Sequence, residues 1–214
     1  KILTELPFIE SISNLRLSYN IAPTQHAFII TDDAPRRLQY VTWGLIPYWS
    51  NDGKNEGKLI NARSEGIESK PSFRMPIRKR RCLVLADSFY EWKREGLNKI
   101  PYRIFRKDRR LLIMAGVWDV WYREDYAVKS FAILTTTPNE EMSRIHRRMP
   151  VIFSNLETYQ RWLSNLELPE VLEMLHPPPD NTLDMYRVSE KVNSVKNDMP
   201  ELHHEIPEPP TLFG

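Results

Sequence analysis

The chain has 214 residues, of which 41% are hydrophobic and 27% are charged, so we expect a packed globular core rather than a disordered chain. The net charge of +2 does not favour a particular partner, and no apolar run approaches the length of a membrane span. A single cysteine, Cys82, excludes an intramolecular disulfide and fits a reducing compartment. Without an internal repeat or a composition shift, residues 1–214 are expected to form one domain.

The first part of the chain predicts short strands and little helix. Residues 1–18 are weakly patterned. Residues 27–31 and 38–43 predict two strands that pair as a hairpin around a turn at residues 32–35.

Asn61 and Arg63 lie two residues apart in a segment that predicts a strand. Side chains of a strand alternate between its faces, so these two share one face. An amide and a guanidinium on one face can orient a polar ligand and hold a phosphate. The alternative is a capping asparagine beside a surface arginine.

The most informative stretch runs from Arg80 to Lys93. Its apolar run at residues 82–86 predicts a strand buried on both faces. After the turn residues Asp87-Ser88, Glu91 lies among three aromatic residues. Because such surroundings disfavour an ionised carboxylate, Glu91 is a candidate general acid or base. On this stretch alone, an edge-strand glutamate with its carboxylate in water is the simpler interpretation.

The rest of the chain predicts further strands, a long loop and three short helices. Helices are predicted after residues 137, 154 and 169, the first two with Thr137 and Ser154 as N-caps. The first helix leads to His146, which would lie near a helix C-terminus that favours a protonated imidazole. A loop is predicted at residues 118–126. Strands are predicted at residues 101–105, 111–117, 130–135 and 151–153 and around Tyr186.

Two basic clusters, at residues 74–81 and 144–148, suit phosphate binding, although for each cluster alone a solvated face is the favoured interpretation. His203 and His204 have no third ligand at a diagnostic spacing, so we predict no metal site. Cys82 could be a thiolate activated by the cations before it, but a buried core thiol is the favoured interpretation.

Five segments together resemble the SOS-response-associated peptidase (SRAP) family. Their order and separation extend over nearly the whole chain, and residues 195–197 agree as well. The segments are residues 19–24, 43–47, 60–65, 81–92 and 145–150. The resemblance implies recognition of abasic sites in single-stranded DNA and covalent attachment to them, with no cofactor.

The resemblance also implies roles for individual residues. Asn61, Glu91 and His146 would support catalysis. Arg63 and Arg148 would contact DNA, while Trp92, Thr135 and Trp49 would line the groove. The family's nucleophile is a cysteine that follows the initiator Met and becomes the first residue after processing. This sequence opens at Lys1 without the family's Cys-Gly-Arg-Phe start, and Cys82 matches a strand position instead.

We therefore expect a single-domain α+β fold, with a curved, mostly antiparallel sheet or open barrel and short flanking helices. The expected function is an abasic-site sensor that forms a thiazolidine crosslink and removes its own initiator Met. It would act as a monomer on single-stranded DNA in the bacterial cytoplasm, at the nucleoid and away from membranes. The alternatives are a cysteine peptidase using Cys82 with His146, and a non-catalytic single-strand-binding module.

Overall fold

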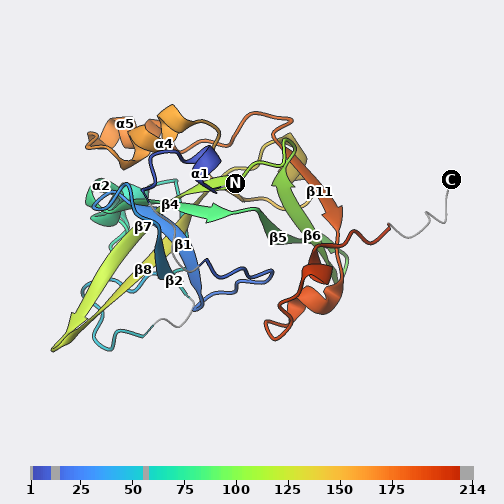
Figure 1. Ribbon diagram of the computed structural model, residues 1–214, viewed down its shortest axis with the longest axis horizontal. Coiled ribbons are helices and arrows are strands. Elements are labelled where there is room, and N and C mark those ends of the chain that lie inside the picture. The colour runs from blue at the N-terminus through green and yellow to red at the C-terminus, as the bar shows by residue number, and fades with distance from the viewer. Residues whose placement is uncertain (1, 11–14, 55–57, 208–214) are drawn as a thin grey trace.

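The computed structural model describes residues 2–10, 15–54 and 58–207 (Figure 1). Its main structural feature is a ring of five strands. The strand β7 pairs with both β4 and β8, β4 pairs with β1, and β2 joins β1 to β8, which closes the ring. The five strands are β1 (His26–Thr31), β2 (Gln39–Trp43), β4 (Arg81–Ala86), β7 (Leu112–Arg123) and β8 (Tyr126–Thr136).

Three short strands extend the ring into an eight-stranded sheet, and three more form a separate sheet. In the smaller sheet the order is β11-β6-β5, so β5 is an edge strand. Only the β2–β8 and β3–β8 pairs are parallel among the described residues, which confirms the expected mostly antiparallel α+β fold. The added strands are β3 (Asn61–Arg63), β9 (Met149–Pro150) and β10 (Ile152–Phe153), and the smaller sheet holds β5 (Ser88–Glu95), β6 (Asn98–Arg106) and β11 (Leu183–Arg187).

The prediction of a loop at residues 118–126 is wrong, because both β7 and β8 extend through it. Trp118 and Trp121 are buried on β7, and only Glu124 and Asp125 separate the two strands. Aromatic and β-branched residues favour strands, and that preference prevails over the charged residues at the tip. Glu124 adopts a left-handed conformation with φ of 46°, which makes the tight turn.

Gly116 allows β7 to pair with two strands at once. It lies opposite Cys82 of β4 and Ile133 of β8. A Cβ atom at this position would come within 2.8 Å of the Cys82 Sγ and 3.0 Å of the Ala132 carbonyl oxygen. A side chain at this position would therefore clash with both neighbouring strands.

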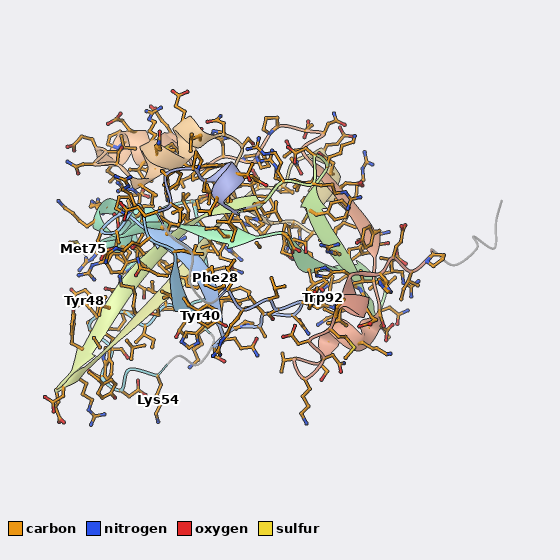
Figure 2. All side chains as sticks on the ribbon, in the orientation of Figure 1. Phe28, Tyr40, Tyr48, Lys54, Met75 and Trp92 are labelled. Carbon is orange, nitrogen blue, oxygen red and sulfur yellow. The ribbon has the colours of Figure 1, made fainter. Side chains whose placement is uncertain are left out.

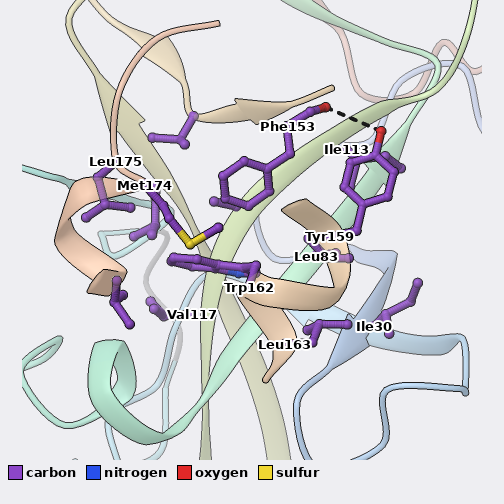
Figure 3. Packing of buried hydrophobic residues seen from close by; sticks show 14 of the residues in the cluster. Ile30, Leu83, Ile113, Val117, Phe153, Tyr159, Trp162, Leu163, Met174 and Leu175 are labelled. Carbon is purple, nitrogen blue, oxygen red and sulfur yellow. Dashed lines mark hydrogen bonds between the residues drawn. The ribbon is translucent and has the colours of Figure 1, made fainter. Parts of the chain in front are cut away.

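Two hydrophobic clusters make up most of the core. Cys82 and Val84 belong to one, and Leu83 of the same strand belongs to the other, so β4 is buried on both faces as predicted. The cluster around Cys82 also takes side chains from β6 and β11, which joins the barrel to the three-stranded sheet. The other cluster packs beneath the helices, where the ring centroids of Trp162 and Phe153 are 5.3 Å apart (Figure 3).

The helices are short, and α4 and α5 cover one side of the barrel (Figure 1). The three predicted helices are present, but the proposed N-caps are wrong. Asn139 and Asn155 accept the backbone N–H of Met142 and Thr158, because their side chains stand at the position that reaches the third helical N–H. The helices are α1 (Ile2–Glu5), α2 (Pro76–Lys79), α3 (Glu140–Ser143), α4 (Leu156–Leu163) and α5 (Leu168–Glu173).

The helix α1 lies within a stretch for which the sequence predicted no element. Three short 3-10 helices complete the described chain, at Ile67–Ser69, Glu190–Asn193 and Pro200–His203. No helix in the described ranges has the length and apolar character needed to cross a membrane.

Arg81 joins the barrel to two helices. Its guanidinium is buried and donates to the carbonyls of Trp162 and Ser164, at 3.0 and 2.5 Å, at the C-terminal end of α4. It also donates to the carbonyls of Ile77 and Arg78, at 3.2 and 3.0 Å, in α2. Carbonyls at helix C-termini lack intrahelical partners and carry partial negative charge, so one cation satisfies both ends.

The basic cluster at residues 74–81 is therefore engaged in structure at several positions. Arg80 pairs with the buried Asp119, and Arg78 donates to the carbonyls of Glu68 and Arg74. Arg78, Arg80 and Arg81 thus have partners within the protein and do not form a fully solvated face.

We predict that Arg81→Lys lowers the free energy of unfolding by about 3 kcal/mol, because an ammonium cannot reach all four carbonyls and bonds from a charged donor contribute about 1.5–3 kcal/mol each. Arg36→Lys is the control, since Arg36 pairs with Glu10 in an exposed ion pair and should lose less than about 1 kcal/mol. Urea denaturation followed by tryptophan fluorescence measures both. An Arg81→Lys variant as stable as the parent would contradict this account.

Candidate functional site

A cleft of about 430 Å³ opens along the edge strand β5. The β5–β6 hairpin forms one wall, and the segments after α3 and around Glu190–Asn193 supply the rest. The cleft therefore combines segments that are up to about a hundred residues apart in the chain. Its lining residues are Glu91, Trp92, Arg94, Lys99, His146 and Asn193.

Glu91 is the acidic group of this cleft. It lies on β5 opposite Tyr102, and its Oε2 is 3.6 Å from the Nδ1 of His146. Its Oε1 accepts the backbone N–H of Trp92 at 3.1 Å. Burial raises the pKa of Glu91 above its usual value, while the Trp92 N–H and His146 oppose that rise. Glu91 is therefore on an edge strand as expected, but its carboxylate is partly buried instead of lying in open water, and it is suited to carry a proton.

His146 is held in place by its own backbone and by Arg148. Its backbone N–H donates to the Met142 carbonyl at 2.8 Å, at the end of α3. Its Nδ1 is 3.2 Å from the Arg148 backbone nitrogen and 3.1 Å from the Arg148 carbonyl oxygen. Nδ1 can accept from the N–H when unprotonated and donate to the carbonyl when protonated. Nδ1 thus has a backbone partner whether or not it carries a hydrogen.

Trp92 has a fixed orientation at the cleft. Its Nε1 donates to the Asn193 Oδ1 at 2.8 Å. Asn193 lies in a segment held by the buried Asn20, whose amide donates to the carbonyls of Val192, Ser194 and Asn197 at 3.1 to 3.2 Å. The segment around Asn20 and the segment 192–197 are thus tied together beside the cleft.

A second polar group lies beside the cleft and is centred on Arg148. Its guanidinium forms a bidentate pair with Glu65, at 2.5 and 2.9 Å, and donates to the Thr135 carbonyl at 2.5 Å. This pairing lowers the pKa of Glu65. Arg63 lies opposite Thr135 in the parallel β3–β8 pair. The hydrogen bonds between Arg148 and His146 connect this group to the cleft.

Asn61 and Arg63 are exposed on the same side of β3, with the buried Ala62 between them, as the sequence predicted. Neither side chain lines the cleft itself. Of the eight predicted site residues, three line the cleft, namely Glu91, Trp92 and His146. Three more, Arg63, Thr135 and Arg148, make up the Arg148 group. Asn61 shares one face of β3 with Arg63.

Trp49 is the predicted site residue that the structure places elsewhere. Its side chain is 52% exposed and does not line the cleft. The neighbouring Tyr48 donates its backbone N–H to Asp119 at 3.0 Å, on the far side of the molecule from Trp92 (Figure 2). A DNA strand that reached both Trp49 and Trp92 would have to cross the molecule.

Cys82 is fully buried between β1 and β7, and burial raises the pKa of its thiol well above the usual value. A thiolate nucleophile requires the opposite environment, with solvent access and neighbouring cations. His146 lies in the cleft, whereas Cys82 is part of the core. The structure therefore removes the basis for a peptidase that uses these two residues.

Sequence reasoning missed three residues that line the cleft, Arg94, Lys99 and Asn193. A signal for the first two was present, because a two-residue turn at Gly96-Leu97 aligns them across a hairpin. Gly96 has φ of 61°, as such turns require. Asn193 offered no comparable signal, since its position depends on long-range contacts.

Comparison with known proteins agrees with the resemblance stated from the five segments. The family model described as SOS response associated peptidase (SRAP) matches residues 4–195. The chain belongs to the SRAP family. A crystal structure of a Bacteroides thetaiotaomicron protein superposes on the SRAP chain with a TM-score of 0.78 and 34% identity, covering 86% of this chain and 82% of the other.

Two curated relatives of the SRAP chain are named abasic site processing proteins. YoqW of Bacillus subtilis is 45% identical over 190 residues, covering 86% of this chain and 84% of the relative. HMCES of Gallus gallus is 33% identical over 221 residues, covering 87% of this chain and 65% of the relative.

We predict that Glu91→Gln stabilises the folded SRAP chain at neutral pH. Because the folded-state pKa of Glu91 is raised, its ionisation opposes folding, and this cost appears as the pH rises through the folded-state pKa. The gain in unfolding free energy should therefore be present near pH 7.5 and vanish near pH 4, about the pKa of the unfolded chain. Urea denaturation at the two pH values measures it.

Glu95→Gln is the matched control, because Glu95 is on the same strand and its carboxylate is about half exposed. Loss of stability in Glu91→Gln at neutral pH would show that the carboxylate is a structural requirement instead.

Proposed function

We propose that this SRAP chain senses abasic sites in single-stranded DNA and becomes covalently attached to them through a cysteine at the mature N-terminus. The observation that carries the proposal is the pair of Glu91 and His146, 3.6 Å apart in a cleft that also presents Trp92 and two cations. The names of the relatives YoqW and HMCES support the choice of abasic DNA as the target.

The open form of an abasic sugar is an aldehyde, which an amine can attack. The terminal α-amine titrates closer to neutral pH than a lysine, so more of it is unprotonated and nucleophilic. Its attack on the aldehyde carbon, with loss of water, gives a Schiff base. The thiol of an N-terminal cysteine then adds to the imine carbon, and its proton moves to the nitrogen. The product is a five-membered thiazolidine, which an internal cysteine cannot form because its nitrogen is an amide.

Glu91 and His146 would move the protons that these steps require. Ring opening of the sugar needs a proton at the ring oxygen, and loss of water needs one at the leaving hydroxyl. A carboxyl whose pKa is raised by burial holds such a proton more readily than an exposed one. The same pair would serve removal of the initiator Met. The cysteine thiol would attack the carbonyl carbon of Met, the peptide C–N bond would break as its nitrogen takes a proton, and water would then hydrolyse the thioester to release Met and restore the thiol.

Arg63, Arg148 and Asn61 would position the strand and the amine. The two arginines would contact phosphates, which fix the strand without reading its sequence. In this structure Glu65 occupies the bidentate edge of Arg148, so a phosphate would have to displace that carboxylate or bind another edge. The carbonyl oxygen of Asn61 would accept from the terminal amine. The indole of Trp92, held by Asn193, would stack on a base.

The setting we propose is the bacterial cytoplasm, at the nucleoid, with the protein acting as a monomer and without a cofactor. No group of three potential metal-binding side chains is found in the described part of the chain. His203 packs instead against the ring of Tyr19, with centroids 5.1 Å apart.

We predict that a chain beginning at Lys1 binds abasic single-stranded DNA but leaves no adduct on denaturing electrophoresis. It has an amine but no adjacent thiol, so only a Schiff base can form, and this hydrolyses unless borohydride traps it. A chain preceded by Met-Cys-Gly-Arg should lose its Met and give a stable adduct without reductant.

Changing that added cysteine to serine should abolish the stable adduct, while Cys82→Ser should leave it unchanged because Cys82 is buried. Stable crosslinking by the chain beginning at Lys1, prevented by Cys82→Ser, would overturn the proposal. Equal binding of intact and abasic strands without any adduct would favour a non-catalytic binding module.

A further inference from the structure

Arg94 and Lys99 form an unusual pair on the β5–β6 hairpin. They lie directly opposite each other in the strand register, and both line the cleft. Like charges in directly opposed positions destabilise a hairpin. No carboxylate in the described residues forms an ion pair with either cation. This hairpin therefore bears a local electrostatic cost that its own residues do not offset.

The neighbouring lysine shows the contrast. Lys93, between Trp92 and Arg94, forms an ion pair with Glu95 in which Nζ and Oε1 are 2.6 Å apart. Side chains alternate along a strand, so Lys93 and Glu95 share one face and Trp92 and Arg94 share the other. The unpaired cations are thus on the side of the hairpin that carries the indole of Trp92.

The same register places Trp92, Arg94 and Lys99 on one face, because Lys99 stands directly opposite Arg94 and Arg94 is two residues from Trp92. The face therefore presents a fixed aromatic ring followed by two exposed cations. A ring beside cations is the arrangement with which proteins bind single strands, the ring for a base and the cations for the backbone.

We propose that Arg94 and Lys99 form a phosphate subsite that binds the DNA backbone next to the abasic nucleotide. The inference rests on the proposed function, because it takes the Glu91–His146 pair as the position of the abasic sugar. Three residues of strand separate Arg94 from Glu91, a distance of roughly 10 Å. The subsite therefore holds a flanking phosphate rather than the reacting nucleotide. The hairpin's like-charge repulsion is relieved when the phosphate binds.

The test is the salt dependence of binding to a fluorescent abasic oligonucleotide, measured by anisotropy with Arg94→Gln, Lys99→Gln and the double variant. Each lost phosphate contact should reduce the slope of log K against log salt by about 0.7. Affinity at low salt should fall severalfold in each single variant. Removal of either charge relieves the repulsion, so the variants should be at least as stable as the parent, and urea denaturation checks that they fold.

Lys93→Gln is the matched control, since it removes one positive charge from the same strand at a side chain that does not line the cleft and is paired with Glu95. It should keep the parental slope and affinity. If Lys93→Gln lost as much affinity and salt slope as Arg94→Gln, net charge alone would be responsible for binding, and the proposed subsite would be overturned.

Oligonucleotides that lack the nucleotides on one side of the abasic site locate the contact. Removal of the flank that reaches the subsite should weaken DNA binding by the parent but should not weaken binding by the double variant any further. Removal of the other flank should weaken binding by both proteins equally. A double variant with parental slope and affinity would refute the subsite and leave the proposed function standing. Failure of the parent to prefer abasic over intact strands would refute the proposed function itself.

Discussion

The buried guanidinium of Arg81 is the interaction on which the arrangement of the molecule depends. It stands at the start of β4 and donates to carbonyls at the ends of two helices. The partial negative charge of these helix ends offsets the cost of burying its positive charge. Burial lowers the pKa of Arg81, although Asp32 opposes this. One end of the stretch that carries the site is thereby fixed to the helical layer.

The other end of that stretch leaves the barrel. β4 ends at Ala86 and β5 begins at Ser88, so a single residue separates strands that belong to different sheets. The change of sheet makes β5 an edge, and no other strand of the described residues covers Glu91 and Trp92. An edge strand usually needs protection against pairing with other chains. Here the His146 segment and the segment tied down by Asn20 lie beside it and create the cleft.

Much of the fold could be predicted from local patterns, because alternation and turn residues determine where strands begin and end. The apolar run at residues 82–86 and the shared face of Asn61 and Arg63 are examples. The prediction of a loop at residues 118–126 was wrong because charged residues at the hairpin tip concealed the strand propensity around them.

The site was harder to predict from the sequence than the fold. The raised pKa of Glu91 and the Arg148–Glu65 pair arise from contacts between distant segments, which no local pattern specifies.

The central claim is that abasic DNA binds at the edge of β5 and beside Arg148. Hydrogen exchange measured with and without an abasic oligonucleotide tests it most directly, because protection reports where the strand lies. The account predicts new protection in the β5–β6 hairpin and in residues 145–148, and none in α4 or α5. Protection confined to the helical layer, or to the segment around Trp49, would contradict it.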